Sequence, residues 1–245
     1  MELLLSSYVL TGVQRPRMLP ATTVTGRAGI ILNALDQYGA TRDYALVREQ
    51  KTLASWGYRA EELDLRAYFA SPDSPDAPGS SESLSSSGAP SSPGSTGPSG
   101  PSGSPDALAA RLAGLDMVWA LGGNVFVLAR AMHAAGFHAA LQRQSGRAEF
   151  VYGGYSAGAC VAGPDLQGLG FVDDEEIVPP GYPAAARPVS LGLVPFRIVP
   201  HWQSDHPDAS AVDAAVAWLG QAGLEHRCLR DGEVVTRDGA VIALP

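Results

Sequence analysis

The sequence predicts an α/β fold, a three-layer sandwich with a mostly parallel central sheet and helices on both faces. Three observations support this prediction. Strand and helix patterns alternate along the chain. The stretch 116–121 is apolar on both faces, which is typical of a strand in the centre of a parallel sheet. Glycines follow two of the predicted strands just before a helix begins, at Gly122-Gly123 and Gly153-Gly154.

The predicted elements of the first part of the chain precede a segment of unusual composition. We expect strands at 2–6, 28–32 and 60–65 and a helix at 42–56. Of the 34 residues from Ser71 to Ser104, 14 are Ser, 7 are Pro and 6 are Gly, so the segment cannot bury enough apolar area to offset its ordering entropy. Closing a loop of this length costs only about 2 kcal/mol. We therefore expect a disordered surface loop inside one domain of residues 1–245, and not a linker.

The second part of the chain continues the alternation. The expected helices cover 105–113, about 125–135, 157–162 and 209–221, and the expected strands cover 116–121, 149–152 and 196–199. Short strands with turns at Gly232 and Gly239 end the chain.

The charge and the first residues indicate where the protein works. The formal net charge is -8 and there is no basic run, which argues against binding to nucleic acid or to an anionic membrane surface. The chain begins with Met-Glu and a short apolar run, so we predict a first strand, no signal peptide and no transmembrane helix. Cys160 and Cys228 are then expected to be reduced thiols in a cytoplasmic protein.

Ser156 is the strongest candidate for chemistry. It lies in Gly154-Tyr-Ser-Ala-Gly158, between a predicted strand and a helix of small residues. This arrangement is typical of a nucleophile on a sharp turn, where small neighbours leave the hydroxyl exposed. The alternative is a glycine-rich turn that binds a phosphate.

A serine needs a base to take its proton, and the chain has five histidines. We select His201 because it follows the strand 196–199, and active sites form at the carboxyl ends of parallel strands. The other four fit ordinary packing, loop or strand positions: His133, His138, His206 and His226.

The orienting acid and the oxyanion donors have several candidates. Asp231 follows a predicted strand, although Asp-Gly is also a common turn sequence. Asp173 and Asp174 lie between the serine and the histidine. The backbone N–H groups of Gly123 and Ala157 are the candidate oxyanion donors, and the alternative for Gly123 is a plain turn.

No cofactor or metal is expected. The sequence has no Walker A motif and no Gly-x-Gly-x-x-Gly after an early strand. The cluster of His201, Asp205, His206 and Asp208 lacks a recognised ligand spacing.

Taken together, four motifs resemble the S51 serine peptidases, which include peptidase E (aspartyl dipeptidase) and cyanophycinase. They are Gly-Gly-Asn at 122–124, Gly-Tyr-Ser-Ala-Gly-Ala at 154–159, Gly-Leu-Val at 192–194 and Val-Pro-His at 199–201. The resemblance implies a sheet like that of class I glutamine amidotransferases and a triad in the order Ser, His, acid. Ser156, His201 and Asp231 match that order. Asp174 matches an acidic position that many members have after the serine, so the resemblance implies an additional acid of the site at this position, outside the triad.

The resemblance implies a serine peptidase of the peptidase E type that hydrolyses small peptides, such as Asp-X dipeptides. Long peptidase E members have a C-terminal tail near the active site, whereas this sequence ends at Pro245, and no Arg stands out as the partner of a substrate carboxylate. The alternatives are a hydrolase of another amide or ester and a small-ligand-binding homologue without catalysis. The expected partners are a small peptide substrate and a second copy of the chain in a homodimer.

Overall fold

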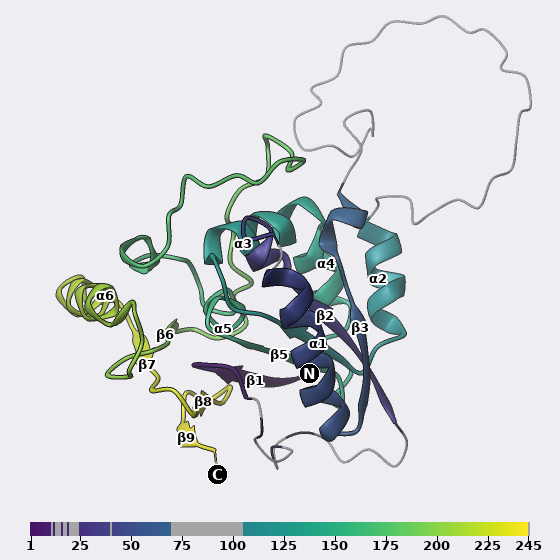
Figure 1. The fold of residues 1–245 in the computed structure, drawn as a ribbon, viewed down its shortest axis with the longest axis horizontal. Helices are drawn as coiled ribbons and strands as arrows, with labels where there is room; N and C mark the ends of the chain where they lie inside the picture. The colour runs from purple at the N-terminus through teal and green to yellow at the C-terminus, as the bar shows by residue number, and fades with distance from the viewer. Residues whose placement is uncertain are drawn as a thin grey trace, which may run out of the picture.

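The computed structural model describes residues 1–10, 12, 16, 19, 25–39, 41–69 and 105–244 (Figure 1). The predicted Ser/Pro/Gly-rich loop at 71–104 lies outside these residues. Strands from both sides of it belong to the same sheet, as described next.

The centre of the molecule is a seven-stranded sheet with the order β3-β2-β4-β5-β1-β8-β9. The first five strands in this order are parallel, whereas β8 pairs antiparallel with β1 and β9 pairs antiparallel with β8. The mostly parallel α/β fold is therefore confirmed. The strands are β1 (Glu2–Ser6), β2 (Gly26–Ile31), β3 (Tyr58–Glu62), β4 (Met117–Ala120), β5 (Val151–Tyr155), β8 (Glu233–Val235) and β9 (Val241–Ala243).

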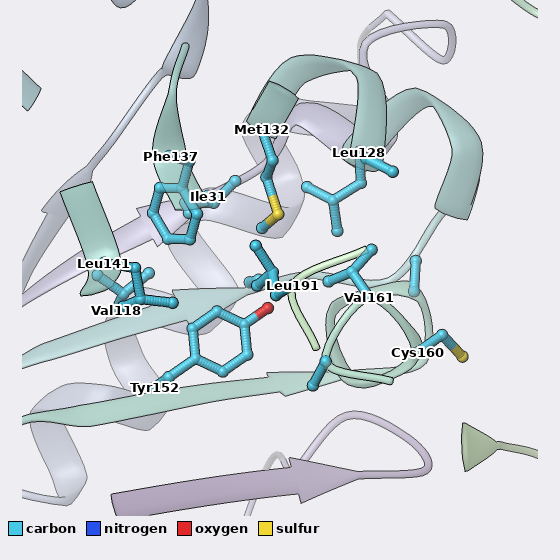
Figure 2. Packing of buried hydrophobic residues seen from close by; sticks show 14 of the residues in the cluster. Ile31, Val118, Leu128, Met132, Phe137, Leu141, Tyr152, Cys160, Val161 and Leu191 are labelled. Carbon is cyan, nitrogen blue, oxygen red and sulfur yellow. The ribbon is translucent and has the colours of Figure 1, made fainter. Parts of the chain in front are cut away.

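Helices cover both faces of the sheet (Figure 1). One apolar cluster joins the sheet to α1 (Thr41–Ser55), and another joins its opposite face to α2 (Pro105–Ala113), α3 (Val125–Ala134), α4 (Phe137–Gln142) and α5 (Ala157–Cys160). Trp119 and Val118, neighbours on β4, belong to different clusters, as the alternation of side chains along a strand requires. Figure 2 shows the second cluster, in which Met132 and Leu128 of α3 and Phe137 of α4 lie above Tyr152 of β5.

A smaller two-stranded sheet, separate from the central one, contributes residues to the cleft described below. The strands β6 (Arg197–Val199) and β7 (His226–Cys228) pair in parallel with each other, and α6 (Ala209–Gln221) connects them. Short 3-10 helices occur at η1 (Asn33–Leu35), η2 (Leu65–Tyr68) and η3 (Leu169–Phe171).

Several boundaries differ from those predicted by one to three residues, including those of β3, β5 and α5. The strand expected at 60–65 is β3, which ends at Glu62 and is followed by η2. The strand expected to end at Tyr152 continues to Tyr155, because Gly153 packs against Trp119: a Cβ there would lie 2.5 Å from the indole ring. The helix expected at 157–162 is shorter and ends at Cys160. Finally, α4 was not predicted, because six residues are too few to show a clear helical period.

Candidate active site

Ser156 lies at the point where β5 turns into α5. Its φ is 49° and its ψ is -119°, a backbone conformation that residues other than glycine rarely adopt. The turn is held by its N–H group, which donates to the carbonyl oxygens of Ser6 and Ser7, each at 3.1 Å. Gly122 packs directly against it, because a Cβ at Gly122 would lie 2.9 Å from the Ser156 Cβ. A strained strand-to-helix turn with small neighbours is the geometry of an exposed nucleophile.

His201 lies opposite Ser156. The distance between His201 Nε2 and Ser156 Oγ is 3.2 Å, and His201 is only 4% exposed. The strand that precedes it, β6, belongs to the two-stranded sheet and not to the central one, so His201 follows a strand as predicted, but on a different sheet from the one expected. The turn after β6 gives His201 a φ of 62°, a second strained position in the same site.

Asp231 occupies the position on the far side of the imidazole. Its Oδ1 lies 2.8 Å from His201 Nδ1, and its own N–H donates to Ser204 Oγ at 2.8 Å. A carboxylate only accepts, so Nδ1 carries the proton and Nε2 is left as the acceptor for the Ser156 hydroxyl. The structure thus brings Ser156, His201 and Asp231 together in the arrangement of a serine–histidine–acid triad.

The other two candidate acids lie elsewhere. Asp174 is exposed, its Oδ1 accepts from the N–H of Glu176, and its backbone oxygen accepts from Asn124 Nδ2. Its neighbour Asp173 instead faces the cleft, with Oδ2 accepting from the N–H of Val125 at 2.8 Å. Of these two neighbours, Asp173 and not Asp174 therefore lines the cleft, because the chain after η3 turns the first of the two carboxylates toward the start of α3.

Ser7 was missed by the sequence analysis, although it contacts two members of the triad. It is fully buried just after β1. Its Oγ accepts from the backbone N–H of His201 at 2.8 Å, and Asp231 Oδ1 is also 2.8 Å away as an acceptor for its proton. A Ser-Ser pair at the end of an apolar strand was the only sequence feature that pointed to it.

The N–H groups of Gly123 and Ala157 are available to a ligand. Both residues line the cleft. Gly123 has a φ of 133°, a backbone conformation that only glycine adopts without strain. A Cβ at Gly123 would also lie 2.5 Å from the backbone oxygen of Ala34. Among the described residues, neither N–H has a backbone acceptor, which fits the predicted role of oxyanion donor.

The cleft around Ser156 has a volume of about 420 Å³. Its lining includes tyrosines and Arg48 of α1, and Arg48 is the one Lys or Arg among the described lining residues. The lining also includes two acids, Asp173 and Asp208. The cleft thus presents a cation and two carboxylates from different elements.

Burial sets the protonation of the site. It lowers the pKa of His201, an effect that the hydrogen bond to Asp231 opposes and the neighbouring His206 ring reinforces. Burial raises the pKa of Asp173 to about 6, and the nearby Asp208 carboxylate adds to this. His201 is therefore neutral at pH 7, the state that a general base needs.

Neither a metal site nor a membrane-spanning helix is found among the residues that the structure describes. Within the described ranges, no three His, Cys, Asp or Glu side chains group together as a metal site would require. Across the same ranges, every helix is too short or too polar to cross a lipid bilayer. Cys160 and Cys228 are free thiols, and burial raises the pKa of both.

The fold and the site define the class of protein: a three-layer α/β protein with a Ser-His-Asp constellation on a strand-to-helix turn. The model of peptidase family S51 matches residues 102–243, which is more than half of the chain and includes Ser156, His201 and Asp231. The chain belongs to peptidase family S51.

The chain is also similar to two known proteins. Peptidase E of Streptomyces coelicolor is 37% identical over 102 residues, which are 41% of this chain and 38% of that protein. The match therefore spans well under half of the curated relative. The crystal structure of a proposed peptidase E protein from Listeria monocytogenes EGD-e superposes with a TM-score of 0.67. It covers 98% of this chain and 96% of the other at 19% identity, so it shows a shared fold.

Proposed function

We propose that the protein is a serine peptidase that hydrolyses small peptides through Ser156, His201 and Asp231. Two short distances support this most directly. Ser156 Oγ lies 3.2 Å from His201 Nε2, and His201 Nδ1 lies 2.8 Å from Asp231 Oδ1. Membership of family S51 supports the same reaction.

The reaction follows from these positions. Ser156 Oγ attacks the peptide carbonyl while His201 Nε2 takes the hydroxyl proton, and Asp231 stabilises the imidazolium that forms. The N–H groups of Gly123 and Ala157 bind the oxygen that becomes negative. His201 then gives its proton to the leaving amine, and a water molecule activated by the same imidazole hydrolyses the acyl-enzyme.

The charges of the cleft support a short peptide with free ends, and Asp-X dipeptides are the substrates we propose to test first. Asp173 and Asp208 suit a substrate ammonium group, and Arg48 suits a substrate carboxylate. Arg48 is already held by Glu49, with Nε donating to Oε1 at 2.8 Å, and by Tyr155, whose hydroxyl accepts from Nη2 at 2.6 Å. These contacts fix the guanidinium in one orientation in the lining of the cleft.

Labelling with a fluorophosphonate probe tests the nucleophile. The wild-type protein should be labelled, Ser156→Ala should not be, and Ser145→Ala, a change at an exposed serine, should behave like the wild type. Persistent labelling of Ser156→Ala would refute the assignment.

A substrate panel tests specificity separately. It compares Asp-X, Asn-X and Glu-X dipeptides with p-nitrophenyl esters. If Arg48 binds the side-chain carboxylate of the substrate Asp, Arg48→Gln should raise KM for Asp-X about tenfold or more and leave KM for Asn-X nearly unchanged. Hydrolysis of esters alone would favour a hydrolase of another substrate class with the same site.

A further inference from the structure

A second imidazole lies directly on the ring of His201. The rings of His201 and His206 are stacked, with centroids 3.8 Å apart and planes inclined by 8°. From the sequence, His206 was predicted to be a loop residue, and the triad mechanism gives it no role.

The pair is enclosed by groups that fix its geometry. Tyr8 contacts both rings edge-on, at 5.6 Å from His201 and 6.0 Å from His206. Asp231 holds the Nδ1 side of His201, as described above, and Asp208 flanks His206. The His201 ring thus has a neighbour on one face, on one edge and at Nδ1, which leaves Nε2 directed at Ser156.

The surroundings of His206 accommodate it both neutral and protonated. In the neutral ring, Nδ1 accepts from the backbone N–H of Asp208 at 3.3 Å. In the protonated ring, Nδ1 is a donor, and the Asp208 carboxylate lies 3.5 Å from it. Histidine is the side chain that ordinarily changes its charge between pH 5 and 8.

The two states of His206 have opposite effects on the reaction. His201 becomes an imidazolium when it takes the Ser156 proton. A neutral ring stacked on it is compatible with that charge, whereas a protonated ring at 3.8 Å repels it across a partly buried contact.

We propose that His206 is a positioning residue for His201, which holds the ring plane by stacking and allows Ser156 to be activated only while His206 is neutral. This inference rests on the proposed function for its kinetic consequence and on the geometry of the two rings for the rest. Its consequence is that replacing His206 by a ring that takes no proton should change how activity falls in acid.

The pH dependence of kcat/KM tests the proposal, with His206→Phe as the main variant. Phenylalanine keeps a flat ring for stacking and cannot take a proton. The acid limb of the wild type should approach a slope of 2 in a plot of log kcat/KM against pH, and that of His206→Phe a slope of 1. His206→Ala should also give a slope of 1, with kcat at the plateau about two- to tenfold lower because the ring contact is lost.

His138→Phe is the matched control, since His138 is an exposed histidine on α4 outside the cleft. It should reproduce the wild-type profile. Equal slopes in the wild type and His206→Phe would overturn the proposal, as would a plateau in His206→Ala equal to that of the wild type.

Nuclear magnetic resonance titration of the histidine rings keeps the proposal testable without turnover. With His206→Phe, the midpoint of His201 protonation should move to higher pH, because the repelling neighbour is gone. An unchanged midpoint would overturn the proposal. Failure to hydrolyse any peptide, combined with a shifted midpoint, would refute the proposed function and leave the coupling of the two rings standing.

Discussion

Replacement of Ser7 by alanine should damage the site even though Ser7 is not a member of the triad. The hydroxyl of Ser7 accepts from the buried N–H of His201, and its own proton is within reach of Asp231 Oδ1. The variant leaves that N–H without its acceptor, which costs about 1 to 3 kcal/mol of the free energy of unfolding. It also removes a hydrogen bond to a charged carboxylate, so we expect labelling by the fluorophosphonate probe to slow about 10- to 100-fold.

Ser6→Ala is the matched control for this experiment. Ser6 is equally buried and is adjacent in the chain, but its hydroxyl donates to the backbone oxygen of Tyr8 at 2.7 Å and touches no triad side chain. Urea unfolding gives the stability of each variant, and the second-order labelling rate gives the reactivity of Ser156. If Ser7→Ala and Ser6→Ala lose the same labelling rate, the positioning role assigned to Ser7 is wrong.

Three other predictions follow from the site and its supports. Asp231→Asn should lower kcat/KM by about 10³- to 10⁴-fold, since an amide favours the wrong tautomer of the catalytic imidazole; a loss below tenfold in steady-state assays would contradict this. Gly158→Ala should cost about 3 kcal/mol or more in urea unfolding because its Cβ would lie 2.1 Å from the Ala120 oxygen, whereas Gly170→Ala, with open space at its Cβ, should stay within about 1 kcal/mol. Burial raises the pKa of Asp173 from 3.8 to about 6, so its contribution to stability is present below pH 3.8 and is lost as the pH rises through about 6. Asp173→Asn should therefore match the wild type in acid and be about 1 to 3 kcal/mol more stable at pH 7, and equal pH dependence of the two proteins would contradict the raised pKa.

Most of the central sheet follows from local patterns in the sequence. The apolar runs at β1 and β4 and the amphipathic pattern of α1 can each be read within the segment itself, because the order of its apolar residues shows which faces are buried. The end of β5 did not follow from such a pattern. Gly153 and Gly154 suggest a turn locally, but close packing on Trp119 and on the Ala120 backbone requires glycine inside the strand.

In the candidate site, too, some residues were indicated by local sequence, whereas other contacts depend on the tertiary structure. Ser156 and His201 stand next to strand ends, and their local sequences indicated their place. The contacts of Ser7 with Asp231 join residues 224 positions apart, so they depend on the register of β1 between its two neighbours. The choice between Asp173 and Asp174 depends on which side of a single turn faces the cleft, and the stacking of His206 on His201 depends on the path of a loop. None of these is determined by a local pattern.

The position of β1 has a consequence for how the site unfolds. In the sheet β1 lies between β5, which leads into Ser156, and β8, which follows the turn that carries Asp231. Local opening that removes β1 from the sheet would therefore take away the strand that both neighbours share, so this part of the sheet and the site should open as one cooperative unit.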